Sequence, residues 1–214
     1  MRFPGLRKVN PINAVREEVT GSTDGYRGEI GLTVWRKSLV FNCNGFTVFN
    51  MRGELKFRVD CYQSGSSEIM LMDSAGNPIF TIARKRLGFG DNWLIFDGES
   101  STNTLFYARK CRSANILSHN SKPLLVRVSP ARHDAMSSPA YEVEGSFVQR
   151  RCSIFECDCK TMTRRKVAEI KPKEAVAGMA FGCDVFRLIV WPDLVDTSLV
   201  MAIVVVLDQM FGTS

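Results

Sequence analysis

Residues 196–212 read Asp-Thr-Ser-Leu-Val-Met-Ala-Ile-Val-Val-Val-Leu-Asp-Gln-Met-Phe-Gly, and this stretch decides the fold. The nine residues from Leu199 to Leu207 are all apolar, and an aspartate follows them at position 208. A helix that spans a bilayer needs about 20 apolar residues, so this run is too short to cross a membrane. We therefore expect no transmembrane segment here and assign the run to the interior of a folded domain.

The length of this apolar run is compatible with a strand or a helix. Its flanks favour a helix, because residues 196–198 are good N-cap residues and Gly212 is a natural helix stop. A helix that is apolar on all sides must be buried on all sides, which a chain can achieve by wrapping a sheet around it. The β-branched residues of the run favour a strand instead; these are Val200, Ile203, Val204, Val205 and Val206.

The chain before this run shows a series of short strand patterns. Residues 55–61, Leu-Lys-Phe-Arg-Val-Asp-Cys, alternate between apolar and polar side chains, as in a half-buried strand. Clusters of Gly and Ser separate the runs at short spacing, which is typical of an all-β barrel or sandwich. We expect a flexible leader over residues 1–24 and a single domain over 25–214. The predicted strands are 55–61, 68–72, 78–84, 93–96, 105–110, 124–128, 141–148, 152–159, 165–170 and 185–191.

The composition is that of a folded, mildly basic protein. Of the 214 residues, 45% are hydrophobic and 23% are charged, so we do not expect the chain to be intrinsically disordered. The formal net charge of +6 is compatible with a nucleic acid or an anionic membrane as partner, and it decides for neither.

The cysteines indicate a reducing compartment. There are seven, an odd number, and the chain shows neither an apolar signal core near Met1 nor an Asn-x-Ser/Thr sequon. Cys157 and Cys159 share one face of a predicted strand, but no nearby CxxC or histidine completes a metal site. We therefore expect reduced thiols, no metal and no cofactor.

Several motifs resemble those of the plant LURP-one-related proteins. The main one runs over residues 69–86, from Ile-Met-Leu-Met-Asp-Ser to Ile-Ala-Arg-Lys-Arg, and continues in Trp-Leu-Ile-Phe-Asp-Gly-Glu at 93–99. Further matches lie at 32–38, 167–170 and 184–190, so the resemblance covers residues from about 25 to 212 in order. It implies the tubby-like fold, a closed antiparallel barrel of about twelve strands around a buried hydrophobic C-terminal helix.

The resemblance also implies a function. LURP-one-related proteins are linked to plant defence, and the related tubby domains bind phosphoinositides. We therefore expect a non-enzymatic, monomeric binding or scaffold protein in plant defence signalling, with anionic phospholipids and an unidentified signalling protein as partners. It would be cytoplasmic, peripheral at the plasma membrane or nuclear. The alternatives are a membrane-released, nucleic-acid-associated regulator like tubby, or a scramblase-like lipid protein.

Clusters of basic residues offer a candidate lipid-binding or phosphate-binding surface. If the turns that carry them lie at one end of the barrel, they would form a basic rim. Each Lys or Arg near an anionic membrane contributes about 1 kcal/mol, so three or four would give weak, salt-sensitive association. The alternative is that these charges are scattered solubilising groups. The candidate residues are Arg84, Lys85, Arg86, Arg109, Lys110, Arg164, Arg165 and Lys166.

The sequence predicts no catalytic residue. His119 and His133 lie in loop-like sequence, and no Gly-x-Ser-x-Gly motif is present. Gly88-Phe89-Gly90 lacks the third glycine of a phosphate loop, and residues 73–77 lack the rest of a calcium loop. Both segments are predicted to be turns.

Overall fold

The computed structural model describes residues 28–40, 44–61, 68–85, 91–111, 122–131, 139–158, 160–175 and 181–212. Two of the predicted features therefore lie outside the described residues, the leader and the turn at 88–90. So do Arg86, both histidines, Cys43 and Cys159. The elements are β1 (Ile30–Trp35), β2 (Asn44–Asn50), β3 (Leu55–Cys61), β4 (Glu68–Asp73), β5 (Pro78–Arg84), β6 (Asn92–Asp97), β7 (Thr104–Lys110), β8 (Leu124–Pro130), β9 (Tyr141–Ser146), β10 (Arg151–Asp158), β11 (Thr163–Pro172), β12 (Val185–Val190) and α1 (Thr197–Phe211).

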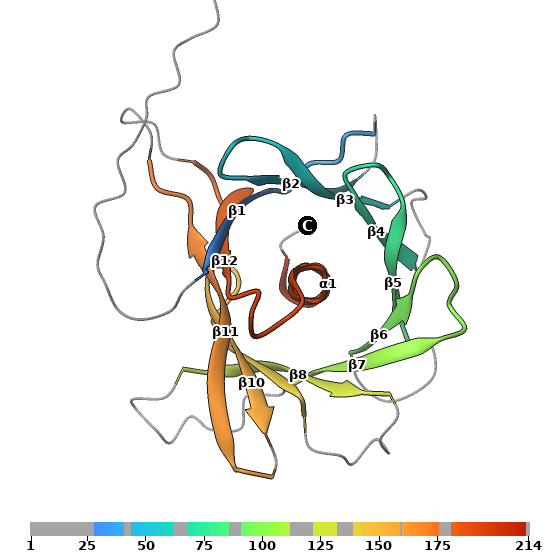
Figure 1. Ribbon diagram of the computed structural model, residues 1–214, viewed down its shortest axis with the longest axis vertical. Helices are drawn as coiled ribbons and strands as arrows, with labels where there is room; N and C mark the ends of the chain where they lie inside the picture. Colours follow the sequence, from blue (N-terminus) through green and yellow to red (C-terminus); the bar gives the residue numbers. More distant parts are fainter. Residues whose placement is uncertain are drawn as a thin grey trace, which may run out of the picture.

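The strands form one closed barrel in which each pairs antiparallel with its neighbours in sequence (Figure 1). The first and last strands close the ring, with Ile30 opposite Val190 and Trp35 opposite Val185. Among the twelve described strands, closure leaves no unpaired sheet edge. The expected closed antiparallel barrel is confirmed.

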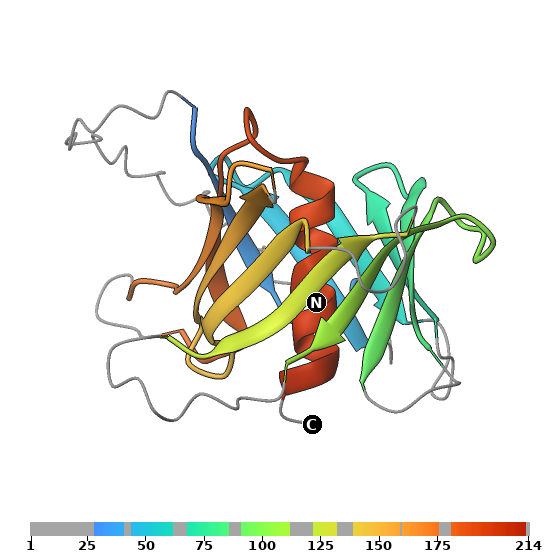
Figure 2. The ribbon, with the colours of Figure 1, turned by 90° about the horizontal axis from the view of Figure 1, so that it is seen from below.

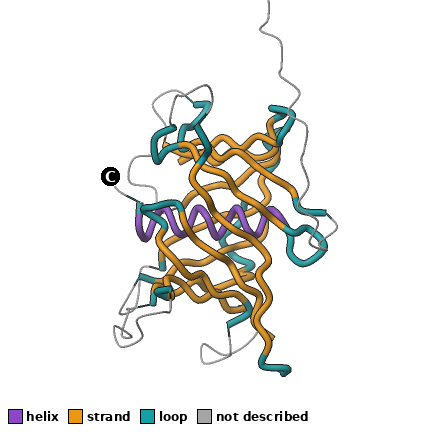
Figure 3. The backbone as a smooth tube through the Cα atoms, turned by 90° about the vertical axis from the view of Figure 1, so that its left-hand side faces the viewer, coloured by secondary structure: helices purple, strands orange, loops and turns teal. Residues whose placement is uncertain are grey.

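Helix α1 runs lengthwise inside the ring of strands (Figures 2 and 3). Every residue from Leu199 to Leu207 is at most 5% exposed. Asp196 is the N-cap, and its carboxylate accepts a 2.7 Å hydrogen bond from the Ser198 N–H. Burial on all sides and this cap outweigh the strand preference of the β-branched residues, so the helix alternative is the correct one.

Ten of the strands match the strand-like runs of the sequence, while β1 and β2 have no counterpart among them. In β2 the alternation fails because three consecutive residues, Phe46, Thr47 and Val48, are buried. Thr47 is a polar residue with no exposed surface, and its hydroxyl donates to the carbonyl oxygen of Lys37. β9 also ends two residues earlier than predicted, because residues 147–150 form a turn.

The strand order divides the loops between two ends of the barrel. We call the end where α1 finishes the C-terminal end, and the end where α1 begins the N-terminal end. Arg36, which follows β1, and Lys110, the last residue of β7, both contact the last turns of α1. Because neighbouring strands are antiparallel, the ends of odd-numbered strands and the starts of even-numbered strands all lie at the C-terminal end.

Candidate functional site

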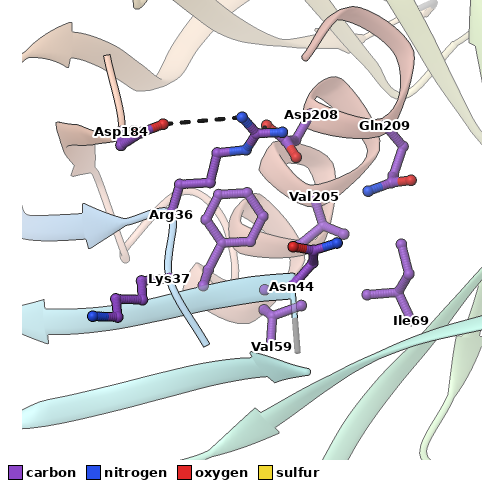
Figure 4. A pocket seen from close by; sticks show the side chains of 11 residues that line it. Arg36, Lys37, Asn44, Val59, Ile69, Asp184, Val205, Asp208 and Gln209 are labelled. Atoms are coloured by element: carbon purple, nitrogen blue, oxygen red, sulfur yellow. Dashed lines mark ion pairs between the residues drawn. The ribbon is translucent and has the colours of Figure 1, made fainter. Parts of the chain in front are cut away.

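A pocket of about 570 Å³ opens at the C-terminal end of the barrel, beside the last turns of α1 (Figure 4). This volume is in the range of small-ligand pockets. Its polar lining comes from the segment after β1, the start of β2, the segment before β12 and the end of α1. The residues lining the pocket are Arg36, Lys37, Asn44, Gly45, Phe46, Val59, Ile69, Asp184, Val205, Asp208 and Gln209.

Gly45 allows the backbones of β2 and β3 to approach closely at this pocket. A Cβ atom at this position would lie 1.8 Å from the carbonyl oxygen of Val59. No side chain fits at that distance, so glycine is required here for steric reasons and not for an unusual φ.

Asp208 and Arg36 form the main ion pair of the pocket. Asp208 is only 7% exposed, and its Oδ1 lies 3.2 Å from Arg36 Nε. Arg36 also approaches the exposed Asp184, with Nη1 3.9 Å from Oδ1, as the dashed line in Figure 4 marks. Burial raises the pKa of Asp208, and the positive charges of Arg36 and Arg150 oppose that rise. Asp208 was not predicted as a site residue, although an acidic residue in the last turn of an apolar helix is an unfavourable placement that signals a buried partner.

Arg150 is the second cation near Asp208, and it is buried. Its guanidinium lies 4.2 Å from the ring centroid of Phe147 and 4.5 Å from that of Phe186. Its Nε donates a 2.8 Å hydrogen bond to the carbonyl oxygen of Cys183. Burial lowers its pKa, and the nearby Asp208 opposes that change. Arg150 therefore ties the turn after β9 to the segment before β12 and balances the charge of Asp208.

Four of the predicted basic residues lie at the same end of the barrel, on the arc formed by β5, β6 and β7. Arg84 ends β5 and pairs in register with Trp93, while Arg109 pairs with Asn92 on the other side of β6. Lys85 and Lys110 adjoin them in sequence. We call Arg84, Lys85, Arg109 and Lys110 the basic arc.

Not every member of the basic arc is equally available to a ligand. Asp91 lies 2.6 Å from Arg84 Nη2 and 3.7 Å from Lys110 Nζ. Lys110 Nζ also donates to the carbonyl oxygen of Met210 at 2.8 Å. Lys85 lies 5.9 Å from the Tyr107 ring, and the exposed Arg109 has no ion pair among the described residues. Lys85 and Arg109 are therefore the two cations of the arc without a carboxylate partner in the described part of the chain.

The remaining described basic candidates, Arg164, Arg165 and Lys166, lie towards the opposite end of the barrel, near the start of β11. Each of these residues faces glutamates on the outer wall. Arg164 lies 3.2 Å from Glu142 and 2.8 Å from Glu144. The other two pairs are Arg165–Glu156 at 2.6 Å and Lys166–Glu169 at 3.3 Å. The fold thus separates these three residues from the basic arc, and Arg86 lies outside the described residues.

No helix in the described ranges is long and apolar enough to cross a membrane.

A solved structure resembles this chain in its fold. An X-ray structure of an Arabidopsis thaliana protein superposes with a TM-score of 0.60 at 21% sequence identity, covering 85% of this chain and 90% of that one.

Comparisons of sequence identify the family. Protein LURP-one-related 8 of Arabidopsis thaliana is 44% identical over 190 residues, which cover 88% of this chain and 90% of the relative. Protein LURP-one-related 17 of the same plant is 38% identical over 191 residues, covering 85% of this chain and 83% of the relative. The family model described as LURP-one-related matches residues 30–208, nearly the whole barrel and α1. On these matches, the chain belongs to the LURP-one-related family.

Proposed function

We propose that this protein is a non-enzymatic binding protein of plant defence signalling that associates with anionic, phosphoinositide-containing membranes. The basic arc at the C-terminal end of the barrel is the observation that carries the membrane part of this proposal. The family membership and its resemblance to tubby-like domains support the rest. In this view the protein is cytoplasmic and binds reversibly at the plasma membrane.

Two features support a binding function. The interior of the barrel is filled by α1, whose residues from Leu199 to Leu207 are nearly or fully buried, so a partner meets the outside or the ends of the barrel. The basic arc places four cations at or just after the ends of β5 and β7, the two strands that flank β6, and Asp91 pairs with two of them, Arg84 and Lys110. At about 1 kcal/mol for each cation near an anionic surface, this arc supports weak association.

Such association depends on salt. Attraction between exposed charges and a lipid surface is screened within about 8 Å at physiological ionic strength. We therefore expect binding to fall steeply as the salt concentration rises, and to increase when a phosphoinositide with several phosphates is added to the vesicles.

The test is co-sedimentation with phosphatidylcholine–phosphatidylserine vesicles, with and without phosphatidylinositol bisphosphate. The variant Arg84→Ala/Lys85→Ala/Arg109→Ala should bind several-fold more weakly than wild type. Lys110 is left intact because it contacts α1. The matched control is Arg164→Ala/Arg165→Ala/Lys166→Ala, which removes the same number of charges from residues that pair with glutamates.

Three results would count against the proposal. Equal sedimentation of the basic-arc variant and wild type would remove these residues from membrane binding. Absence of wild-type binding to any anionic vesicle would leave interaction with a signalling protein as the function of the family fold. Tighter binding to duplex DNA than to vesicles at the same salt would favour the nucleic-acid-associated alternative.

A further inference from the structure

Large hydrophobic side chains are exposed mainly at one end of the barrel. Of the seven exposed large hydrophobics in the described ranges, four lie in segments at the C-terminal end. They are Trp35 at 39% exposure, Leu39 at 56%, Val148 at 55% and Phe181 at 43%. Single exposed hydrophobics need no explanation, but several on adjoining segments indicate a contact surface. We call these four residues the apolar rim.

The three segments that carry the apolar rim contact one another. The Arg36 N–H donates a 2.7 Å hydrogen bond to the carbonyl oxygen of Asp184, which joins the segment after β1 to the segment before β12. Arg150 Nε donates to the carbonyl oxygen of Cys183, which adds the turn after β9. The apolar rim is therefore one region of the barrel end, built on β1, β12 and the β9–β10 turn.

The segment after β1 is held in place although two of its side chains, Lys37 and Leu39, are exposed. Ser38 Oγ donates to the buried Asp60 at 2.5 Å, and Thr47 Oγ1 donates to the carbonyl oxygen of Lys37 at 2.6 Å. These bonds fix the backbone that presents Trp35 and Leu39. An ordered backbone reduces the conformational entropy that would be lost when these side chains bind a partner.

Cations flank the apolar rim. Lys37 Nζ lies 5.1 Å from the Trp35 ring, and the exposed Arg151 follows the turn that carries Val148. Two exposed acids lie in this region: Asp184, which is 3.9 Å from Arg36, and Glu174, two residues after the end of β11. The basic arc lies across the same barrel end, on β5 to β7. Aromatic and aliphatic side chains beside Lys and Arg suit the boundary between lipid headgroups and acyl chains better than the acidic or neutral surface of a partner protein.

From this arrangement we propose that the apolar rim inserts into the interfacial layer of an anionic membrane while the basic arc contacts the headgroups. The C-terminal end of the barrel then faces the bilayer. This inference rests on the proposed function and adds the orientation of docking and the residues that enter the lipid. It also predicts two components of binding, a salt-sensitive one from the basic arc and a salt-insensitive one from the apolar rim.

Two tryptophans report which end of the barrel meets the membrane. Trp35 lies at the C-terminal end, and Trp191 lies at the N-terminal end, where Lys166 Nζ is 5.6 Å from its ring. Trp93 is 7% exposed in β6 and gives a constant background. The probe is a vesicle of brominated phosphatidylcholine, phosphatidylserine and phosphatidylinositol bisphosphate, because bromine quenches tryptophan fluorescence only at short range. The fluorescence of Trp191→Phe protein, which retains Trp35, should be quenched when the protein binds these vesicles. The fluorescence of Trp35→Phe protein, which retains Trp191, should not be quenched.

A pair of double variants tests the contribution of the apolar rim to affinity. Leu39→Ser/Phe181→Ser should lower the vesicle partition coefficient about tenfold, since each change removes one large apolar side chain from the lipid. Met51→Ser/Met162→Ser is the matched control, because these exposed methionines lie at the opposite end of the barrel. The control should bind like wild type. Because all four side chains are exposed, both variants should keep the wild-type melting temperature.

The outcomes separate this inference from the proposed function. Wild-type binding together with unquenched Trp35 and unchanged affinity of Leu39→Ser/Phe181→Ser would overturn the inference and leave the proposed function standing. Quenching of Trp191 in its place would overturn the orientation. Failure of wild type to bind these vesicles at low salt would overturn both. Quenching of Trp35 with weakened binding of the rim variant supports the inference.

Discussion

Lys110 Nζ donates a 2.8 Å hydrogen bond to the carbonyl oxygen of Met210, which joins the last residue of β7 to the last turn of α1. The same ammonium lies 4.5 Å from the Phe211 ring. The last carbonyl groups of a helix lack partners within the helix, and a cation near them is favourable. Lys110 therefore helps to hold α1 inside the barrel, in addition to its place in the basic arc.

We predict that Lys110→Ala destabilises the fold. Loss of a charged hydrogen bond and of the cation at the helix end should lower the free energy of unfolding by about 1–2 kcal/mol. The neighbouring Arg109→Ala should change it by less than about 0.5 kcal/mol, because Arg109 is exposed on the outer wall. Urea unfolding followed by tryptophan fluorescence measures both values. Equal stability of the two variants would mean that the contact with Met210 does not hold α1.

A charge in the middle of α1 should prevent folding. Val204 has no exposed surface, so Val204→Asp would place an unpaired carboxylate in an apolar interior at a cost of several kcal/mol. We expect aggregated or unfolded protein by near-ultraviolet circular dichroism and size-exclusion chromatography. Gln209→Ser, on an exposed position of the same helix, should fold normally. A soluble Val204→Asp protein with a cooperative transition would contradict the buried helix.

Asp208 should make stability depend on pH. Burial is the main cause of its raised pKa, and Arg36 and Arg150 lower it in part. The native state then binds the Asp208 proton more tightly than the unfolded state, in which the pKa of Asp208 is near the ordinary aspartate value of 3.8. The contribution of this group to stability is thus fully present below pH 3.8 and is lost as pH rises through the native pKa.

The comparison that isolates this group is wild type against Asp208→Asn. The difference in melting temperature, wild type minus variant, should be larger near pH 4 than near pH 7. Subtracting the variant removes the opposite trend of other carboxylates, such as Asp73 and Asp158, whose pKa values are lowered by hydrogen bonds. A difference that grows as pH rises would mean that the two arginines outweigh burial.

The cysteines should differ in reactivity. Burial raises the pKa of Cys152 to about 12, and its side chain is 2% exposed, whereas Cys183 is exposed. The thiolate is the reactive form, so iodoacetamide at pH 8 should modify Cys183 quickly and Cys152 only after unfolding. Mass spectrometry should find all seven cysteines modified after denaturation without a reductant. A thiol that stays blocked under those conditions would indicate a disulfide and contradict the expected reducing compartment.

The sequence by itself determined the elements whose burial follows a local period. β8 alternates as its sequence does, with Val126 and Val128 buried and Arg127 exposed between them, and the limits of α1 follow from Asp196 and Gly212. The sequence also contains enough information to place the basic clusters at opposite ends of the barrel. Arg84 and Arg109 lie at the ends of strands and Arg164 near the start of one, and in an antiparallel series of known strand number these positions fall at opposite ends.

Only the tertiary structure decided which charged and apolar side chains are buried or exposed at the barrel end. Arg150 and Arg151 are adjacent in sequence, yet Arg150 is enclosed by Phe147 and Phe186 while Arg151 is exposed. The apolar rim joins segments more than a hundred residues apart through bonds such as that between Arg36 and Asp184. Local periodicity reports the face on which a residue lies, whereas these contacts depend on which loops the closed ring brings together, and that information is not contained in any one segment.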